Sequence, residues 1–395
     1  MAEHTSRRRF LRRGAAAALC LAPLARAGAQ AARPRASALD AGVPAPKLIA
    51  DLRAFIPDLM KHHGVPGLAA AVVREGRVVW SEGFGVRSVL TKEPVTAETP
   101  FEAASFSKAA FAYVVLKLCE RGKLALDTPL WQYRPDYFLP ADDPRSKLVT
   151  ARMILSHSSG LRWRGEDKTV KFVSDPGKQW NYSPLAYGYL QQIVEHVTGQ
   201  PLEPLMQANL LRPFGMTKSS YDWNETYEKE AARGHDRNGE RVADRNFYEK
   251  FRGFKEEEKA KIRTVQPEDA APGASFSLTT TAADYARLLA EIMRPSRKDE
   301  FRLSERMLAE MLTPQIKVSP AVNWGLGWEV ERGSSADAFY HYGNSSNFQN
   351  LAVGFAREGA GVVILTNSGN GLRLTEKLAS RALGSSRLSH TFSFA

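Results

Sequence analysis

The chain has 395 residues, of which 43% are hydrophobic and 25% are charged, proportions typical of an ordinary soluble globular protein. This length provides enough material for one large domain or two moderate ones. The formal net charge of +11 falls to +6 when the six arginines and one glutamate of residues 1–31 are set aside, so the charge argues against a nucleic-acid partner.

Residues 1–31 predict an export signal. A basic start, MAEHTSRRRFLRRG, precedes an alanine-rich stretch that is too short to span a bilayer. The run from Ser6 to Arg12 resembles the twin-arginine export motif, which implies the twin-arginine export machinery as a partner and a periplasmic or secreted location. Cleavage is expected after Ala29 or after Ala31, and the mature chain is expected to contain no transmembrane segment.

Cysteine usage agrees with export. Cys20 leaves with the predicted signal and Cys119 remains alone, so the mature chain has neither an intrachain disulfide nor a cysteine metal site. No dinucleotide fingerprint and no phosphate-binding glycine-rich loop is present, and no cofactor is expected.

The first elements after a proline- and alanine-rich linker, 32–46, are a helix and a hairpin. The sequence predicts a helix over 47–64, closed by Gly64, and two β-rich runs over 68–85 that turn at Glu75-Gly76. A further helix is expected to begin near Ser105.

The middle of the chain, 124–270, is rich in helices and loops. Helices are expected over 151–161 and 184–199, with Gly160 and Gly199 at their ends. The charged run at 225–269 is interpreted as a solvated face or a mobile insertion and not as a binding site.

β character returns near the C-terminus, in three runs at 324–332, 348–356 and 360–367, and a helix over 373–383 follows them. Strands at both ends of the chain with a helical block between them predict an α/β (α+β) fold, an antiparallel sheet flanked by helices. We expect one domain over 47–385, with sheet parts at about 47–123 and 271–385, a helical insert at about 124–270 and a tail at 386–395.

The first candidate for chemistry is Ser105-Phe106-Ser107-Lys108, because Ser105 is the only serine followed three residues later by lysine. At i and i+3 of a helix the two side chains share a face and can touch. A serine at a helix N-terminus beside a lysine with a lowered pKa can act as an acyl-transfer nucleophile.

Three further segments accompany it: LSHSSGL at 155–161, PGKQWNYS at 176–183 and His341-Tyr342-Gly343-Asn344. With Ser105 and Lys108, in this order, they resemble the serine β-lactamase and penicillin-recognising family, in its class C-like branch of esterases and peptidases. The resemblance covers about 47–385 and implies the β-lactamase/transpeptidase-like fold.

The resemblance also implies roles for particular residues. Ser105 would be the nucleophile, Lys108 its proton acceptor, and Tyr182 a second proton carrier whose phenol Lys108 acidifies. His341 would edge the site on a sheet strand. The backbone N–H groups of Ser105 and of Asn344, which follows Gly343, would form the oxyanion hole, and the chemistry needs no metal.

One position departs from the family pattern: Pro184 stands where the family has an asparagine, so the site lacks an amide for the acylamino group of a penicillin. At position 341 the family has lysine or histidine, and the histidine found here offers no permanent cation to a substrate carboxylate. We therefore expect an esterase or amidase acting on a small-molecule or peptide-like substrate.

Two alternatives stay open: a β-lactamase or D-alanyl-D-alanine carboxypeptidase using the same machinery, and a non-catalytic binding protein on this fold. For His157 in the LSHSSGL segment, we expect a hydrogen-bonding role at the end of a helix.

Overall fold

The structure is a computed structural model that describes residues 45–134, 139–140, 142–162, 170–238, 273–296, 298–332 and 337–383. The chain divides after residue 35, and every described residue lies in the second unit, 36–395. The predicted export signal, the tail at 386–395 and residues 239–269 of the charged run lie outside the described residues.

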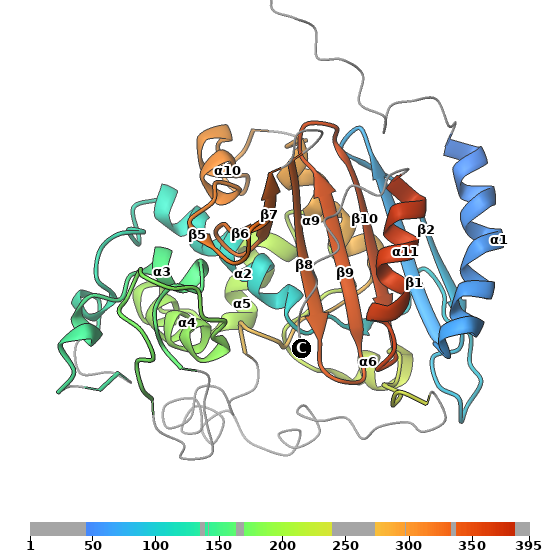
Figure 1. Cartoon of the computed structure of the whole chain (residues 1–395), viewed down its shortest axis with the longest axis horizontal. Helices are drawn as coiled ribbons and strands as arrows, with labels where there is room; N and C mark the ends of the chain where they lie inside the picture. The colour runs from blue at the N-terminus through green and yellow to red at the C-terminus, as the bar shows by residue number, and fades with distance from the viewer. Residues whose placement is uncertain are drawn as a thin grey trace, which may run out of the picture. The chain divides into compact units, whose positions relative to one another are not determined.

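The described residues form an eight-stranded sheet in which every pair of neighbours is antiparallel. Its order is β2 (Arg77–Gly85), β1 (Gly67–Arg74), β10 (Ala360–Thr366), β9 (Gln349–Phe355), β8 (Asp337–Asn344), β7 (Glu329–Arg332), β6 (Val322–Trp324) and β5 (Ile316–Lys317). The N-terminal hairpin therefore joins the C-terminal strands in one sheet (Figure 1).

Helices cover both faces of this sheet (Figure 1). Helices α1 (Ala45–His63) and α11 (Leu372–Leu383) pack on one face, and α2 (Phe106–Glu120) and α9 (Ala282–Met293) pack on the other. Side chains alternate between the two faces along each strand. In β8, Tyr340 and Tyr342 join the α1/α11 cluster, whereas Phe339 joins the α2/α9 cluster.

The remaining elements are a second, two-stranded sheet and further helices. A two-stranded sheet pairs β3 (Phe101–Glu102) with β4 (Thr279–Thr280). The helical elements of the described middle and of the connection to β5 are α3 (Ala151–Leu155), α4 (Pro184–Thr198), α5 (Leu202–Met206), η3 (Gln207–Leu211), α6 (Glu225–Glu230), α10 (Glu305–Met311) and the short turns η1 (Leu130–Gln132) and η2 (Pro144–Lys147). Across the described ranges, we find no helix that combines the length and the apolar character needed to cross a membrane.

The predicted fold class and antiparallel sheet are confirmed, as are the hairpin and the closing helix. Helix α1 begins at Ala45, two residues inside the predicted linker. The predicted helix over 151–161 is wrong in extent, because α3 ends at Leu155. His157 has a φ of 54°, and this left-handed backbone ends the helix before Gly160. Helix α4 does end at Gly199, whose φ is 67°.

Candidate active site

The backbone bends sharply just before α2. β3 ends at Glu102, and Ala104 takes a φ of 49°, a left-handed conformation uncommon for a residue with a Cβ. Ser105 then occupies the N-cap position of α2. Almost the whole of α2 is buried, so the half-buried Ser105 is held at the end of a rigid central helix, as predicted.

The hydroxyl of Ser105 lies between an amine and a phenol. Lys108 Nζ is 3.0 Å from Ser105 Oγ, and Tyr182 Oη is 2.8 Å from the same oxygen. Tyr182 comes from the loop before α4, 77 residues along the chain. The fold therefore brings together three of the residues predicted from sequence.

Lys108 is buried, with 1% of its surface exposed. Its Nζ donates to the backbone oxygen of Ser275 at 2.7 Å and lies 4.9 Å from the centre of the Tyr182 ring. Burial holds the pKa of Lys108 well below its usual value, because desolvation disfavours the charged amine. A neutral Lys108 has a lone pair that can accept a proton from Ser105.

The pKa of Tyr182 is raised, whereas the resemblance implied that Lys108 would lower it. Burial raises it, and the hydrogen bond to Ser105 offsets only part of this effect. At neutral pH the phenol therefore stays protonated, and its O–H donates a hydrogen bond to Ser105 Oγ. The pKa values of Lys108 and Tyr182 are therefore shifted in opposite directions, downward for the amine and upward for the phenol.

His341 lies in β8 and is 2% exposed. Its ring packs edge-to-face on Trp324 and Trp328, with centroid distances of 5.7 Å and 6.3 Å. Nδ1 lies 2.7 Å from the backbone oxygen of Tyr342. Burial, and then the charge of Lys108, lowers the pKa of His341 to about 3, so the imidazole is neutral. Among the described residues, no hydrogen bond joins His341 to Ser105, Lys108 or Tyr182.

The end of β8 runs beside the backbone that precedes Ser105. A Cβ on Gly343 would lie 2.3 Å from the backbone oxygen of Ala103, so only glycine fits this position. Hydrogen-bonded pairs alternate along an antiparallel ladder. Because Ser345 N donates to Phe348 O, the preceding residue, Asn344, directs its N–H away from β9. Among the described residues, β7 pairs with β8 only over 337–340, so no described strand covers that N–H.

Pro184 is buried as the first residue of α4, behind the N-cap Ser183. Proline suits this position because its fixed φ and missing N–H match the start of a helix. His157 does not cap its own helix with its side chain: its Nδ1 accepts from Ser183 N at 3.0 Å. The expected hydrogen bond at the end of α3 is made by the backbone, because His157 N donates to Ile154 O at 3.0 Å, whereas the side chain bonds at the start of α4.

Sequence reasoning missed Ser275, whose backbone oxygen anchors Lys108. It lies 167 residues from Lys108, and a backbone acceptor leaves no trace in residue identity. It also missed the enclosure of His341 by Trp324 and Trp328. The segment WGLGW could have indicated this enclosure, because its two tryptophans flank the turn between strands β6 and β7.

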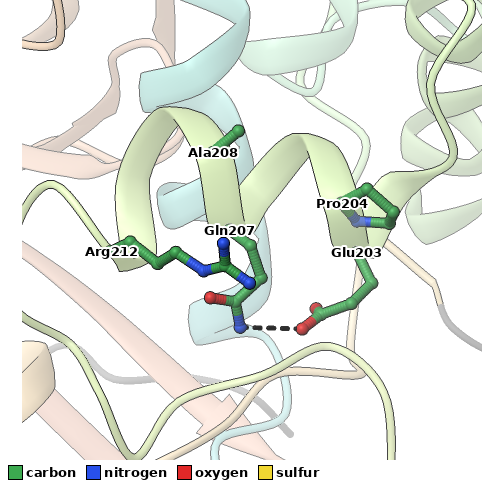
Figure 2. Close-up of a pocket in the computed structure, with 5 residues that line it drawn as sticks. All are labelled: Glu203, Pro204, Gln207, Ala208 and Arg212. Carbon is green, nitrogen blue, oxygen red and sulfur yellow. Dashed lines mark hydrogen bonds between the residues drawn. The ribbon is translucent and has the colours of Figure 1, made fainter.

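A surface pocket of about 380 Å³ lies along α5 and η3, lined by Glu203, Pro204, Gln207, Ala208 and Arg212 (Figure 2). The Glu203 carboxylate already accepts hydrogen bonds from Gln207 Nε2 at 2.8 Å, Ser220 Oγ at 2.7 Å and Tyr221 N at 2.6 Å. It therefore stabilises the local chain, and the pocket shares no residue with the cluster around Ser105.

Comparison with known proteins agrees with this geometry. A family model described as Beta-lactamase matches residues 52–384. The chain is 30% identical over 212 residues to "Esterase EstB" of Burkholderia gladioli. The aligned region covers 46% of this chain and 53% of the esterase. It is 30% identical over 190 residues to "Putative penicillin-binding protein PbpX" of Bacillus subtilis, spanning 44% of this chain and 46% of that protein. The chain thus spans about half the length of these curated relatives.

Two solved structures share the fold. The D-alanine carboxypeptidase AmpC from Burkholderia cenocepacia aligns with a TM-score of 0.70 at 21% identity, over 86% of this chain and 99% of that one. The octameric penicillin-binding protein homologue from Pyrococcus abyssi aligns with a TM-score of 0.69 at 24% identity, over 85% and 78%.

Proposed function

The chain belongs to the β-lactamase family, and we propose that it is a serine hydrolase that forms an acyl-enzyme on Ser105 from an ester or amide substrate. The observation that carries the proposal is the position of Ser105 Oγ, within hydrogen-bond distance of both Lys108 Nζ and Tyr182 Oη. A nucleophile in contact with a base and an acid is the arrangement that acyl transfer requires.

In the first half of the reaction, Ser105 Oγ bonds to the carbonyl carbon while its proton passes to the neutral Lys108 amine. The carbonyl oxygen becomes an oxyanion, held by the backbone N–H groups of Ser105 and Asn344. The bond to the leaving group then breaks, and the leaving oxygen or nitrogen takes the phenol proton of Tyr182. The products are an acyl-enzyme, a tyrosinate and an ammonium.

The second half restores the site. Water attacks the acyl carbon and gives a proton to the Tyr182 phenolate. Ser105 Oγ leaves and regains its proton from Lys108. The low pKa of Lys108 favours the return of this proton, and the nearby ammonium stabilises the transient phenolate.

Two features support an ester or amide without a carboxylate as the substrate. His341 is neutral at a position where the family has lysine or histidine, so it supplies no cation for an anionic substrate. Pro184 has no side-chain amide to receive the acylamino group of a penicillin. The similarity to Esterase EstB agrees with this choice.

A second candidate activity is that of a β-lactamase or D-alanyl-D-alanine carboxypeptidase. It is favoured by the similarity to PbpX, and it would use the same three side chains on a different acyl donor. An assay that offers the protein substrates of each class separates the two candidate activities.

The test offers p-nitrophenyl esters, a chromogenic cephalosporin and a D-alanyl-D-alanine peptide to the purified protein and to Ser105→Ala. We expect ester turnover to exceed the other two activities and to fall by more than about 1,000-fold in Ser105→Ala. A fluorophosphonate should label Ser105. Ser107 is an internal control in the same peptide, because it is fully buried and its Oγ donates to the backbone oxygen of Ala104 at 2.6 Å.

Preferred turnover of the cephalosporin or the peptide would support the second candidate instead. Ester turnover that survives Ser105→Ala would contradict the nucleophile. No turnover together with no labelling would leave the non-catalytic binding protein as the better description.

A further inference from the structure

His157 contacts the segment that carries Tyr182 at three points. Its backbone oxygen accepts from Asn181 N at 2.6 Å, and its Nδ1 accepts from Ser183 N at 3.0 Å. Between these two bonds, its ring lies on the Tyr182 ring with a centroid distance of 4.3 Å and an interplanar angle of 34°. The residue before Tyr182, the residue after it and its phenol ring are therefore all held by one histidine.

His157 is itself fixed by contacts that do not involve Tyr182. Its N–H donates to Ile154 O at 3.0 Å, and the next residue, Ser158, donates to Met153 O at 2.7 Å. The side chain is fully buried, and the ring of Trp324 meets it edge-to-face at 4.7 Å. The left-handed φ of His157 turns the chain so that its oxygen and its ring both face the Tyr182 loop.

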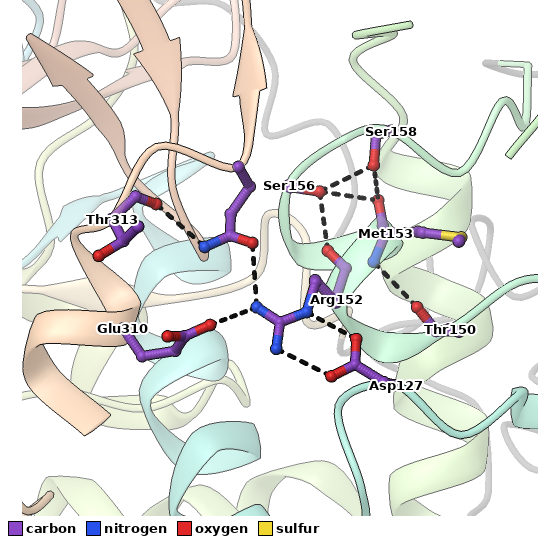
Figure 3. A network of polar contacts seen from close by, with 9 residues as sticks. Asp127, Thr150, Arg152, Met153, Ser156, Ser158, Glu310 and Thr313 are labelled. Carbon is purple, nitrogen blue, oxygen red and sulfur yellow. Dashed lines mark hydrogen bonds and ion pairs between the residues drawn. The ribbon is translucent and has the colours of Figure 1, made fainter. Parts of the chain in front are cut away.

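A polar network, drawn in Figure 3, holds the segment from Thr150 to Ser158. His157 belongs to this segment. Arg152 in α3 donates to both carboxylate oxygens of Asp127, at 2.6 Å and 2.9 Å, and also contacts Glu310 of α10. Ser156 Oγ donates to Arg152 O at 2.8 Å and lies 2.9 Å from Ser158 Oγ. Through Arg152, this network ties the residues just before His157 to Asp127 and to Glu310, which are distant in sequence.

The Tyr182 loop needs such a support. Residues 176–183 precede α4 without forming a helix or strand, so no repeating backbone ladder sets the direction of the phenol. General acid–base catalysis depends on a group held within hydrogen-bond distance, and a displacement of about 1 Å can cost about 100-fold in rate.

We propose that His157 is a positioning residue that holds the Tyr182 phenol against Ser105 through the contact between the two rings and the Nδ1 bond to Ser183. This inference rests on the proposed function, because it matters for catalysis only if Tyr182 transfers a proton. His157 does not touch the reacting atoms itself.

The Nδ1 bond requires an unprotonated nitrogen, so the proton of the neutral ring belongs on Nε2. Burial is the main cause that holds the pKa of His157 well below its usual value, and the neighbouring Lys108 and His341 lower it further, because a proton on either would repel one on His157. Those two residues and the phenols of Tyr182 and Tyr187 are the titratable groups that face the ring. A protonated His157 would present a donor to the Ser183 N–H and lose the bond.

The test compares two amides in place of the ring. His157→Asn puts its carbonyl oxygen close to the position of Nδ1, whereas His157→Gln puts it close to that of Nε2. We expect His157→Gln to lower kcat for the ester about 100-fold with little change in KM. His157→Asn should keep kcat about tenfold higher, the equivalent of one retained hydrogen bond.

His235→Asn is the matched control. His235 is also fully buried, accepts from Val89 N at 3.1 Å and contacts Asn367 O at 2.8 Å. We expect His235→Asn to lower the melting temperature and to leave kcat unchanged. Equal kcat values for His157→Asn and His157→Gln, or losses that follow the melting temperature in all three variants, would overturn the proposal.

A double-mutant cycle tests whether His157 acts through Tyr182. In a Tyr182→Phe background, adding His157→Gln should cause no further loss of kcat, because the phenol is already absent. Losses that multiply would show that His157 acts by another route and would overturn the proposal.

A measurement on the unmodified protein does not depend on any variant folding. Nitrogen-15 NMR of the His157 ring at neutral pH should show an unprotonated Nδ1 and a protonated Nε2. An imidazolium or the opposite tautomer would rule out the Ser183 bond. Ester turnover that survives Ser105→Ala would contradict the proposed function alone, since the ring spectrum tests the placement of His157 separately.

Discussion

Gly343 lies so close to Ala103 that any β-carbon at position 343 would meet the Ala103 backbone oxygen at 2.3 Å. This contact joins the end of β8 to the backbone immediately before Ala104 and Ser105. It therefore sets the spacing between the two N–H groups that we assign to the oxyanion hole.

Gly343→Ala should lower kcat for the ester by about 100-fold, because the strand must move away from Ser105. Steady-state kinetics check this. Gly354→Ala is the control on the neighbouring strand, since a Cβ there meets the ring of Phe339 at 2.5 Å in the core. We expect Gly354→Ala to lower the melting temperature without a specific loss of kcat. Similar kcat values in the two variants would contradict the assignment.

Lys108 should give the reaction its dependence on pH. Burial lowers the pKa of Lys108, and only the neutral amine accepts a proton, so kcat/KM should rise with pH as the ammonium deprotonates. Lys108→Arg should lose about 10²- to 10⁴-fold in rate and lose this rise, because a guanidinium stays charged.

Lys117→Arg is the control for Lys108→Arg on the same helix. Lys117 pairs with Glu120 at 3.0 Å and donates to Arg302 O at 2.6 Å. The pH dependence of kcat/KM for Lys117→Arg should match that of the unmodified protein. A Lys108→Arg variant that keeps the rise would exclude Lys108 as the base.

His341 should make the fold sensitive to acid. Its pKa is about 3 in the folded protein against a reference of 6.5, so between these values the unfolded chain binds a proton that the folded chain does not. The free energy of unfolding therefore falls as the pH falls through this window, by about 2 kcal/mol between pH 7 and pH 5.

His341→Gln removes this contribution, so its free energy of unfolding should fall less than that of the unmodified protein between pH 7 and pH 5. Urea unfolding at the two pH values measures the difference. His62→Gln, on the exposed surface of α1, should behave like the unmodified protein. Parallel losses in His341→Gln and the unmodified protein would count against a buried neutral imidazole.

We propose that residues 1–31 direct export through the twin-arginine pathway to a periplasmic or secreted location. The arginine pair Arg7-Arg8 before Arg9-Phe10-Leu11 supports the proposal. Replacing Arg7 and Arg8 by lysine should retain the precursor inside the cell, as measured by fractionation and immunoblotting. Unchanged export of the double variant would argue for another route.

The sequence predicted the elements whose signals are local. The periodic apolar positions of α2 placed Ser105 at a helix start, and Glu75-Gly76 located the hairpin, where both residues have positive φ values of 53° and 70°. The order of the Ser105, Tyr182 and His341 segments pointed to one site before any contact was known.

What the sequence could not predict depends on tertiary contacts. The left-handed His157 ends α3 early, and no composition signal separates such a residue from a helical one. The raised pKa of Tyr182 follows from burial, which a motif does not encode. The Ser275 oxygen that holds Lys108 is a backbone atom, so any residue type there could provide it.

The pairing of β1 with β10 has a consequence for the order of folding. Leu68 lies opposite Thr366, so the centre of the sheet joins strands from opposite ends of the described chain. The sheet cannot close until its last strand has left the ribosome, and such distant pairing makes folding slow. A chain that stops before β10 would leave β1 and β9 as unpaired edges with apolar faces exposed, a state prone to aggregation.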